Sequence, residues 1–174
     1  MANFLRNGKG IMYYSNGNII YEGDWINNQT EGNGKIFFEN GAYYIGQFKN
    51  DLKHGKGTEY YKNGNIGYNG DLINDKPEGN GKYIYENGDY YIGQWKNGLR
   101  HGKGTMYYSN GNIIYEGDYV NDKRYGNGKY TLENGEYYIG QFKNDLKHGK
   151  GTEYYKNGSI KFDGNWNNNE FVGN

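Results

Sequence analysis

The sequence predicts an all-β protein, an elongated, twisted, single-sheet antiparallel β-meander built from tandem hairpin repeats of about 23 residues. An aromatic-x-Gly opening recurs at intervals that alternate between 23 and 24 residues, starting at Tyr21, Tyr44, Tyr68, Tyr91, Tyr115, Tyr138 and Phe162. Helix is strongly disfavoured, because 31 glycines are spread along the chain and each costs about 1 kcal/mol relative to alanine in a helix. Since each unit of such an array packs only on its neighbours, we expect an open sheet and no closed barrel.

Each repeat contains the signals for two strands. In the first, Tyr44, Gly46 and Phe48 occupy alternate positions and therefore share one face of the sheet. The polar stretch at residues 49–54 provides a reversal, and Asn63-Gly64 provides the next one. Asn-Gly is the strongest short hairpin signal, because both central residues of a type I′ turn need positive φ. Two reversals per repeat predict roughly fourteen strands over the chain.

The array is expected to fill the chain. The period divides it into a partial repeat at 1–20, full repeats at 21–43, 44–67, 68–90, 91–114, 115–137 and 138–161, and a partial repeat at 162–174. Two types of repeat alternate, one with Gly-Asp and Gly-Asn-Gly-Lys, the other with Gly-Gln and His-Gly-Lys-Gly-Thr. Because the chain begins and ends within a repeat, it is either part of a longer array or has ends that pair with something.

Aromatic residues dominate the apolar content, with 22 Tyr, 7 Phe and 3 Trp against a mean hydropathy of −1.15. Their fixed positions argue against disorder, because stacked aromatic side chains can build a thin core. We expect Gly46, Gly55 and Gly57 to make room for an aromatic ring of the neighbouring unit. Leu72 and Phe162 replace the usual aromatic residues of the motif, so their rungs are expected to pack less well.

Charge alternates between the two repeat types. Residues 21–43 hold one basic and four acidic residues, whereas residues 44–67 hold four basic and two acidic ones. Such bands favour pairing between neighbouring repeats, or between two arrays. They argue against a continuous basic surface of the kind that nucleic-acid or anionic-lipid binding normally uses.

No constellation of catalytic residues stands out. His54, His101 and His148 recur two repeats apart, too far to share one ion, and are interpreted as structural. The Gly-Lys-Gly-Thr segments lack the order and the following helix of a phosphate-binding loop. Asp24, Asp71 and Asp118 recur in register as a solvated stripe. We therefore expect no catalytic residues, no cofactor, no metal and no enzyme activity.

The repeat resembles the MORN (membrane occupation and recognition nexus) family, whose unit reads approximately Tyr-x-Gly-x-Trp-x-x-Gly-x-x-x-Gly-x-Gly. Residues 91–104, YIGQWKNGLRHGKG, match it best, and the resemblance extends over nearly the whole chain. At the Gly98 position the other repeats have Asp51, Asp75, Asp122, Asp145 or Asn28, which also suit a turn. The resemblance implies β-meander arrays that act as scaffolds and dimerisation modules, with lipid binding in some members.

The leading hypothesis is a non-catalytic interaction scaffold, a rigid β-ribbon that presents aromatic and glycine-lined surfaces to a protein partner or to itself, as a homodimer or end to end. The candidate partner or stacking ladder consists of Tyr44, Phe48, Tyr91, Trp95, Tyr138 and Phe142. The alternative is a peripheral module that binds anionic phospholipid at a membrane surface. Its candidate contacts are Lys49, Lys53, Lys96, Arg100, Lys143 and Lys147. No nucleic-acid partner is expected, and the expected location is intracellular and cytoplasmic, at the cytoskeleton or a membrane.

Overall fold

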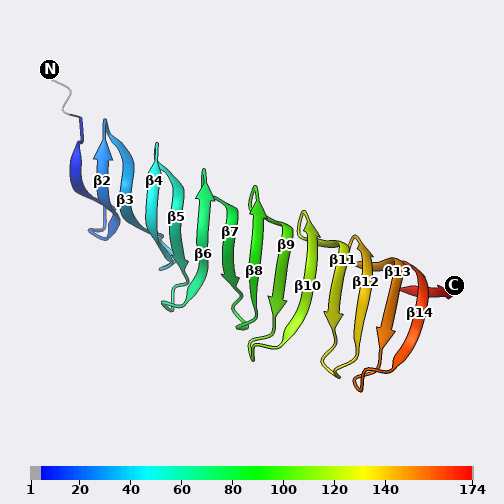
Figure 1. Ribbon diagram of the computed structural model, residues 1–174. Coiled ribbons are helices and arrows are strands. Elements are labelled where there is room, and N and C mark those ends of the chain that lie inside the picture. Colours follow the sequence, from blue (N-terminus) through cyan, green and yellow to red (C-terminus); the bar gives the residue numbers. More distant parts are fainter. Residues whose placement is uncertain (1–4, 174) are drawn as a thin grey trace. The chain divides into compact units, whose positions relative to one another are not determined.

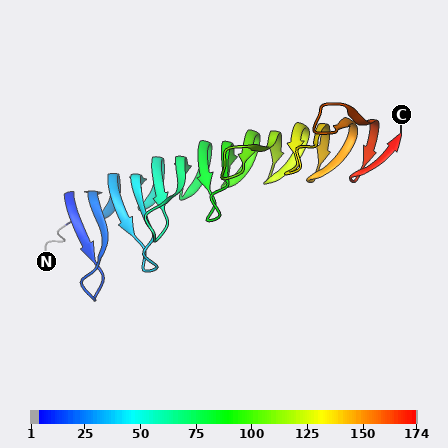
Figure 2. The same ribbon diagram turned by 90° about the horizontal axis from the view of Figure 1, so that it is seen from below.

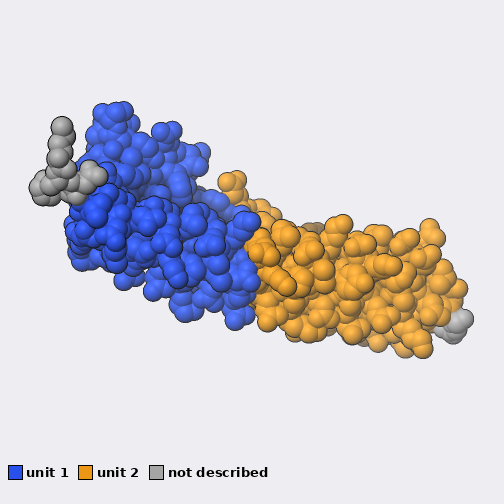
Figure 3. All heavy atoms as spheres, turned by 90° about the horizontal axis from the view of Figure 1, so that it is seen from above, with its two compact units in different colours: residues 1–84 blue, residues 85–174 orange. Residues whose placement is uncertain are grey.

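The computed structural model describes residues 5–173, and over this range it contains strands and no helix. Fifteen described strands form one open antiparallel sheet in which the strand order follows the chain. The predicted meander of hairpins is confirmed, with one strand more than the sequence suggested, a short β15 of four residues. The chain divides into two compact units, residues 1–84 and 85–174 (Figure 3), which are described separately below.

Within each unit, successive strands lie side by side in chain order (Figures 1 and 2). The first unit contains β1 (Gly8–Tyr13), β2 (Ile19–Ile26), β3 (Gln29–Phe37), β4 (Tyr43–Lys49), β5 (Leu52–Tyr60), β6 (Ile66–Ile73) and β7 (Lys76–Ile84). The second contains β8 (Tyr90–Lys96), β9 (Leu99–Tyr107), β10 (Ile113–Val120), β11 (Lys123–Thr131), β12 (Tyr137–Lys143), β13 (Leu146–Tyr154), β14 (Ile160–Asn167) and β15 (Glu170–Gly173).

The two faces of the sheet differ in burial. In β4, Tyr44 and Phe48 are buried and flank Gly46 on one face, while Ile45 and Gln47 are exposed on the other. The same alternation recurs in β8 and β12. We call the face that carries Tyr44, Gly46, Phe48 and their equivalents the ladder face, and the face that carries Tyr43, Ile45, Gln47 and their equivalents the open face. Among residues 5–173, the buried hydrophobic side chains lie on the ladder face.

A row of glycines crosses each unit, with one glycine opposite the next on every pair of strands. In the first unit it runs through Gly10, Gly23, Gly34, Gly46, Gly57, Gly70 and Gly81. In the second it runs through Gly93, Gly104, Gly117, Gly128, Gly140, Gly151 and Gly164. The row fixes the register of the sheet, because a side chain at these positions would occupy the space of the aromatic rings above.

The ring that covers each pair of glycines comes from the same repeat. A Cβ atom added to Gly46 or Gly57 would overlap the ring of Tyr44, which precedes both in repeat 44–67. The expectation of a ring from the neighbouring unit is therefore wrong for these positions. It is also wrong for Gly55, which meets the Gln47 side chain and has a φ of +65°. Gly55 serves a backbone bend, while Gly46 and Gly57 serve close packing.

The sequence predicted type I′ turns at the Asn-Gly loops, but the structure has them at the other reversal of each repeat. Both central residues have positive φ at Asn50-Asp51 (49° and 67°), and the strand partners Lys49 and Leu52 flank them directly, as in a type I′ turn. At Asn63-Gly64 only the glycine has positive φ.

The Asn-Gly loops use a longer turn. The Gly64 N–H donates to the Tyr61 carbonyl at 2.9 Å, and the Tyr61 N–H donates to the Asn65 carbonyl at 2.8 Å. This pattern is that of a three-residue hairpin loop, a type I turn followed by a left-handed glycine. Asn63 keeps a negative φ because its Oδ1 accepts the Asn65 N–H at 2.9 Å and so closes an Asx turn.

Candidate functional site

The six aromatic residues predicted as a partner or stacking ladder lie on the ladder face of their units, and all are buried. Their exposed fractions range from 0% for Tyr44, Tyr91 and Tyr138 to 8% for Trp95. Each Tyr meets the Trp or Phe four residues later edge to face, with centroids 5.2–5.3 Å apart in all three cases. The two side chains of each pair contact each other, and at this degree of burial all six offer almost no surface to a partner.

The ladder continues from one repeat to the next. The Tyr21 ring contacts Phe48 of the following repeat at 5.1 Å, and the Tyr115 ring contacts Phe142 at 5.3 Å, both edge to face. Such pairs contribute roughly 0.5–1.5 kcal/mol beyond the area that they bury. Leu72 is 1% exposed, so the expectation that its rung packs less well is wrong for burial. Phe162 is 41% exposed, as expected for a poorer rung.

Buried phenols tie the ladder to the backbone. The Tyr44 hydroxyl donates a hydrogen bond to the Gln47 carbonyl at 3.0 Å, and Tyr91 and Tyr138 do the same three residues along their strands. Burial, with a smaller contribution from nearby carboxylates such as Glu59, raises the pKa of Tyr44 to about 12. The pKa of Tyr91 is also raised by burial. Ladder tyrosines therefore stay protonated well above their ordinary titration range.

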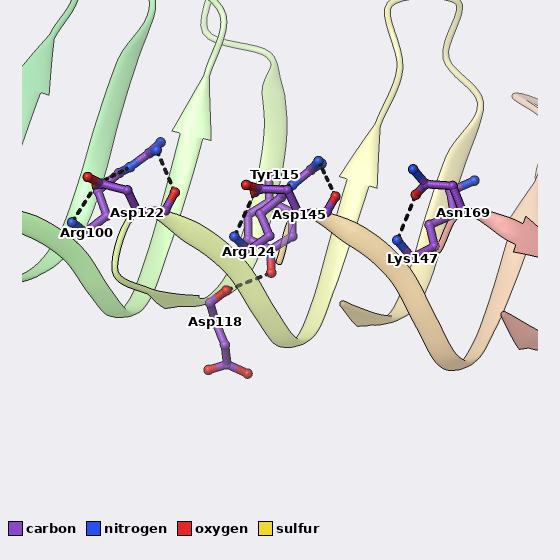
Figure 4. Close-up of polar contacts among 8 residues, drawn as sticks. All are labelled: Arg100, Tyr115, Asp118, Asp122, Arg124, Asp145, Lys147 and Asn169. Atoms are coloured by element: carbon purple, nitrogen blue, oxygen red, sulfur yellow. Dashed lines mark hydrogen bonds and ion pairs between the residues drawn. The ribbon is translucent and has the colours of Figure 1, made fainter. Parts of the chain in front are cut away.

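Six of the type I′ turns dock their repeat on the one before it, an interaction that the sequence reading missed. Asp122 accepts the Arg100 backbone N–H on its Oδ1 at 2.9 Å and donates its own N–H to the Arg100 carbonyl at 3.0 Å (Figure 4). Equivalent paired bonds join Asp51 to Thr30, Asp75 to Lys53, Asp145 to Arg124, Asn28 to Arg6 and Asn169 to Lys147. The recurrence of Asp or Asn at the second turn position was the available signal.

Three of the six predicted lipid contacts lie on the ladder face, where each forms an ion pair with a carboxylate of this chain. The Arg100 guanidinium donates to the Asp122 carboxylate and carbonyl at 3.1 and 2.8 Å, and lies 5.1 Å from the Tyr119 ring. Lys53 forms an ion pair with Glu59, and Lys147 forms one with Glu153.

The other three predicted lipid contacts, Lys49, Lys96 and Lys143, are exposed and lie on the open face beside the turns. The six cations therefore do not share one surface, because the sheet separates them into two sets of three.

Charge alternation corresponds to specific ion pairs between repeats. Lys9 pairs with Asp24 at 3.0 Å, Lys56 with Asp71 at 2.8 Å and Lys103 with Asp118 at 2.6 Å. The three lysines are 73–85% exposed, so each pair contributes only a few tenths of a kcal/mol. The aspartates also accept backbone N–H groups, as Asp24 does from Asn33 at 3.0 Å, which assigns them a structural role.

Histidines at the recurring position lie on β5, β9 and β13 and are partly buried. The Nδ1 atoms of His54, His101 and His148 are enclosed and have no hydrogen-bond partner among residues 5–173. Over the same residues, no group of three or more His, Cys, Asp or Glu side chains is placed to hold a metal ion. Nor does this part of the chain include a helix with the length and apolar character needed to span a membrane.

The open face carries two equivalent hollows, one in each unit. Both lie over the glycine row and are lined by glycines together with polar and aliphatic side chains. The first is lined by Lys9, Ile11, Glu22, Asn33, Lys35 and Ile45, and the second by Lys103, Thr105, Glu116, Asn127, Lys129 and Ile139. Each residue of the second lies 94 positions after its counterpart, and Ile11 to Thr105 is the one change. The open face therefore presents the same surface twice.

Comparison with known families agrees with this architecture. The family model described as MORN repeat matches residues 21–43, 44–66, 68–90, 91–113, 115–137 and 138–160, and the model described as MORN repeat variant matches residues 6–27. Matched segments begin at the leading Tyr of each hairpin and end after its Asn-Gly loop, so the family unit coincides with the structural unit. The chain belongs to the MORN repeat family.

Proposed function

We propose that this chain is a non-catalytic interaction scaffold that holds a protein partner against its open face. The observation that carries the proposal is the pair of equivalent hollows around Ile45 and Ile139. Both isoleucines are exposed, at 43% and 45%. A surface that is repeated once in each unit can hold two equivalent segments of a partner, which increases avidity without new contacts.

The chemistry of the hollows favours a protein segment of mixed charge. In each, a glutamate lies opposite a lysine across neighbouring strands, Glu22 beside Lys35 and Glu116 beside Lys129. A partner that brings an acidic group to the lysine, a basic group to the glutamate and an apolar side chain to the isoleucine complements this surface. An anionic membrane would meet the two glutamates as well as the lysines, which weakens its attraction.

Site-specific photocrosslinking tests this proposal. A photoreactive amino acid in place of Ile45 or Ile139 should capture the same protein from a lysate of the source cells. The same amino acid in place of Ile73 or Val120, exposed at 48% and 39% away from both hollows, is the matched control. Capture should be lost when Lys35→Glu and Lys129→Glu are combined. Equal capture from the control positions, or capture that survives the charge reversal, would refute the open face as the binding surface.

A second candidate function, binding to anionic phospholipid, is supported by one further observation. At five type I′ turns, a lysine is the direct strand partner of an aliphatic residue: Lys49 with Leu52, Ile73 with Lys76, Lys96 with Leu99, Val120 with Lys123, and Lys143 with Leu146. Cationic and aliphatic side chains that are paired in this way suit the interface of a charged membrane.

Vesicles with and without phosphatidylserine distinguish the candidates. Under the lipid function, binding is strong at low salt, falls as salt rises, and is lost when Lys49, Lys96 and Lys143 become Glu. Lys62→Glu and Lys156→Glu change exposed lysines of the Asn-Gly loops and should leave vesicle binding unchanged. A protein that stays in solution at low salt is not a lipid-binding module of this kind.

A further inference from the structure

Three pairs of tyrosines stack face to face on the open face of the sheet. Tyr43 stacks on Tyr60, Tyr90 on Tyr107 and Tyr137 on Tyr154, with ring centroids 4.5, 4.6 and 4.6 Å apart and planes inclined by 12°, 12° and 14°. In each pair the two residues are direct partners across the strands of one hairpin. All six rings are partly exposed. The carbons of each ring are thus held in contact with those of its partner and within reach of solvent.

These six tyrosines differ from the ladder tyrosines of the opposite face. The phenol of Tyr44 is enclosed, donates to a backbone carbonyl and keeps its proton up to a pKa of about 12. One-electron oxidation of a phenol releases a proton, and an enclosed, hydrogen-bonded phenol has no solvent to receive it. The phenols of the stacked rings are partly exposed and can release a proton to solvent. The fold therefore separates one set of tyrosines that is protected from oxidation from another that is available to it.

We propose that the three stacked pairs are sites of oxidative dityrosine cross-linking, which joins the two strands of a hairpin covalently. A peroxide-dependent haem peroxidase is the class of oxidant that the reaction requires. Each phenol of a pair loses one electron and one proton and becomes a phenoxyl radical. The two partly exposed rings rotate until two ε carbons meet and a C–C bond forms between them. The hydrogen of each of those carbons then moves, through solvent, to the phenol oxygen of its ring, which restores the hydroxyl and the aromaticity. In total, two tyrosines and one hydrogen peroxide give one dityrosine and two water molecules.

The cross-links would form within a chain. Because the partner radical lies in contact within the same hairpin, coupling inside the pair competes with the slower encounter between two molecules. Each bond would close a loop of 18 residues, from Tyr43 to Tyr60 for example, and restrict the unfolded chain. The array would thereby resist unfolding without any change in its folded surface.

Peroxidase treatment of the dilute full-length chain tests the proposal. The expected result is dityrosine fluorescence, an intact monomer mass lowered by two hydrogen atoms per link, peptides cross-linked at 43–60, 90–107 and 137–154, and a higher unfolding temperature. Tyr60→Phe, Tyr107→Phe and Tyr154→Phe together remove one phenol from each pair but keep its ring. This triple variant should fold normally and lose nearly all the intrachain product.

The matched control replaces three tyrosines outside the pairs, Tyr13, Tyr125 and Tyr155, with Phe. They are 55%, 43% and 45% exposed, so they would dominate the product if exposure alone determined reactivity. The proposal expects an unchanged yield from this control. Links that map mainly to these three residues, links mainly between chains, or an undiminished yield from the triple variant would each overturn it.

Discussion

Asp122 and Arg100, 22 residues apart, are joined by four hydrogen bonds between neighbouring repeats. The Asp122 carboxylate accepts from both the backbone N–H and the side-chain Nε of Arg100, while the Arg100 carbonyl and guanidinium bond to the Asp122 backbone (Figure 4). A turn residue thus bonds to the backbone N–H and carbonyl of a strand residue in the preceding repeat. Cohesion between repeats therefore depends on the turns as well as on the aromatic ladder.

Replacement of Asp122 should show how much these turn bonds contribute. Asp122→Ala removes the acceptor of two bonds, one of them from a charged group, and should lower the free energy of unfolding by about 1–2 kcal/mol. Asp122→Asn is the matched control, because Asn28 accepts the equivalent bond from Arg6 at 2.7 Å. Urea unfolding measures both. If Asn costs as much as Ala, the negative charge matters and the backbone acceptor does not.

A side chain in the glycine row should disrupt the sheet. Gly46→Val would place methyl groups where the Tyr44 ring and the Gly57 backbone lie, and should destabilise the chain by about 3 kcal/mol. Gly64→Ala is the control, because a Cβ there meets no atom within 4 Å and bears only the strain of a φ of +83°. Its cost should be about 1 kcal/mol. Thermal unfolding at equal heating rates ranks the two, and a ranking in the reverse order would contradict the packing role of the row.

Alkaline pH should unfold the chain through its ladder tyrosines. The pKa of Tyr44 is raised by burial from 10.0 to about 12, so the folded state holds a proton that the unfolded state releases above pH 10. This contribution to stability is complete below pH 10 and is lost as the pH rises towards 12. Tyr44→Phe should flatten the dependence of unfolding temperature on pH in this window. A variant whose alkaline profile matches that of the unchanged chain would show that Tyr44 does not contribute.

Lys53 and Glu59 should be replaceable by the Arg and Met of the next repeat of that type only when both are changed together. Lys53 pairs with Glu59, whereas the equivalent positions in the next repeat of that type are Arg100 and Met106. Glu59→Met alone leaves the half-buried Lys53 ammonium without its carboxylate and should cost about 1 kcal/mol.

Adding Lys53→Arg should restore stability. Asp75 already accepts the Lys53 backbone N–H at 2.8 Å, and its position corresponds to that of Asp122, so it can receive the guanidinium. A double-mutant cycle on the unfolding free energy measures the coupling, and strictly additive losses would argue against paired exchange.

Periodicity alone predicts most of this fold. The alternation of Tyr44, Gly46 and Phe48 identifies the buried face, and the fixed spacing identifies the hairpins, because in a meander both depend on local sequence. The Asn-Gly turns were misassigned because propensity permits positive φ at Asn63, while the hydrogen bond from Asn63 Oδ1 to the Asn65 N–H favours another turn type. Positive φ and the Asx-turn hydrogen bond are both local preferences of Asn63, and the sequence alone does not rank them.

Contacts between repeats were harder to foresee. Asp51 was interpreted as a turn former, which it is, but its bond to Thr30 depends on how neighbouring hairpins align. Lys53 and Lys49 look equivalent in sequence, yet the pleat directs them to opposite faces, where one is paired and the other exposed. The predicted ladder residues share one face, as their alternate spacing indicates, but their burial became evident only from the coordinates. Identification of the open-face hollows required coordinates, because glycines from four strands contribute to each.

The ion pairs between repeats recur every two hairpins, which makes the pair of hairpins the repeating unit of matched neighbours. Lys9, Lys56 and Lys103 each meet an aspartate of the hairpin that follows, whereas the next junction places the uncharged Asn33 beside Gln47. Loss of a single hairpin would bring together two repeats of the same type and remove these matched neighbours. Loss or duplication of two hairpins, 47 residues, restores every junction. A gain or loss of two hairpins at once therefore keeps these pairings, whereas a gain or loss of one hairpin does not.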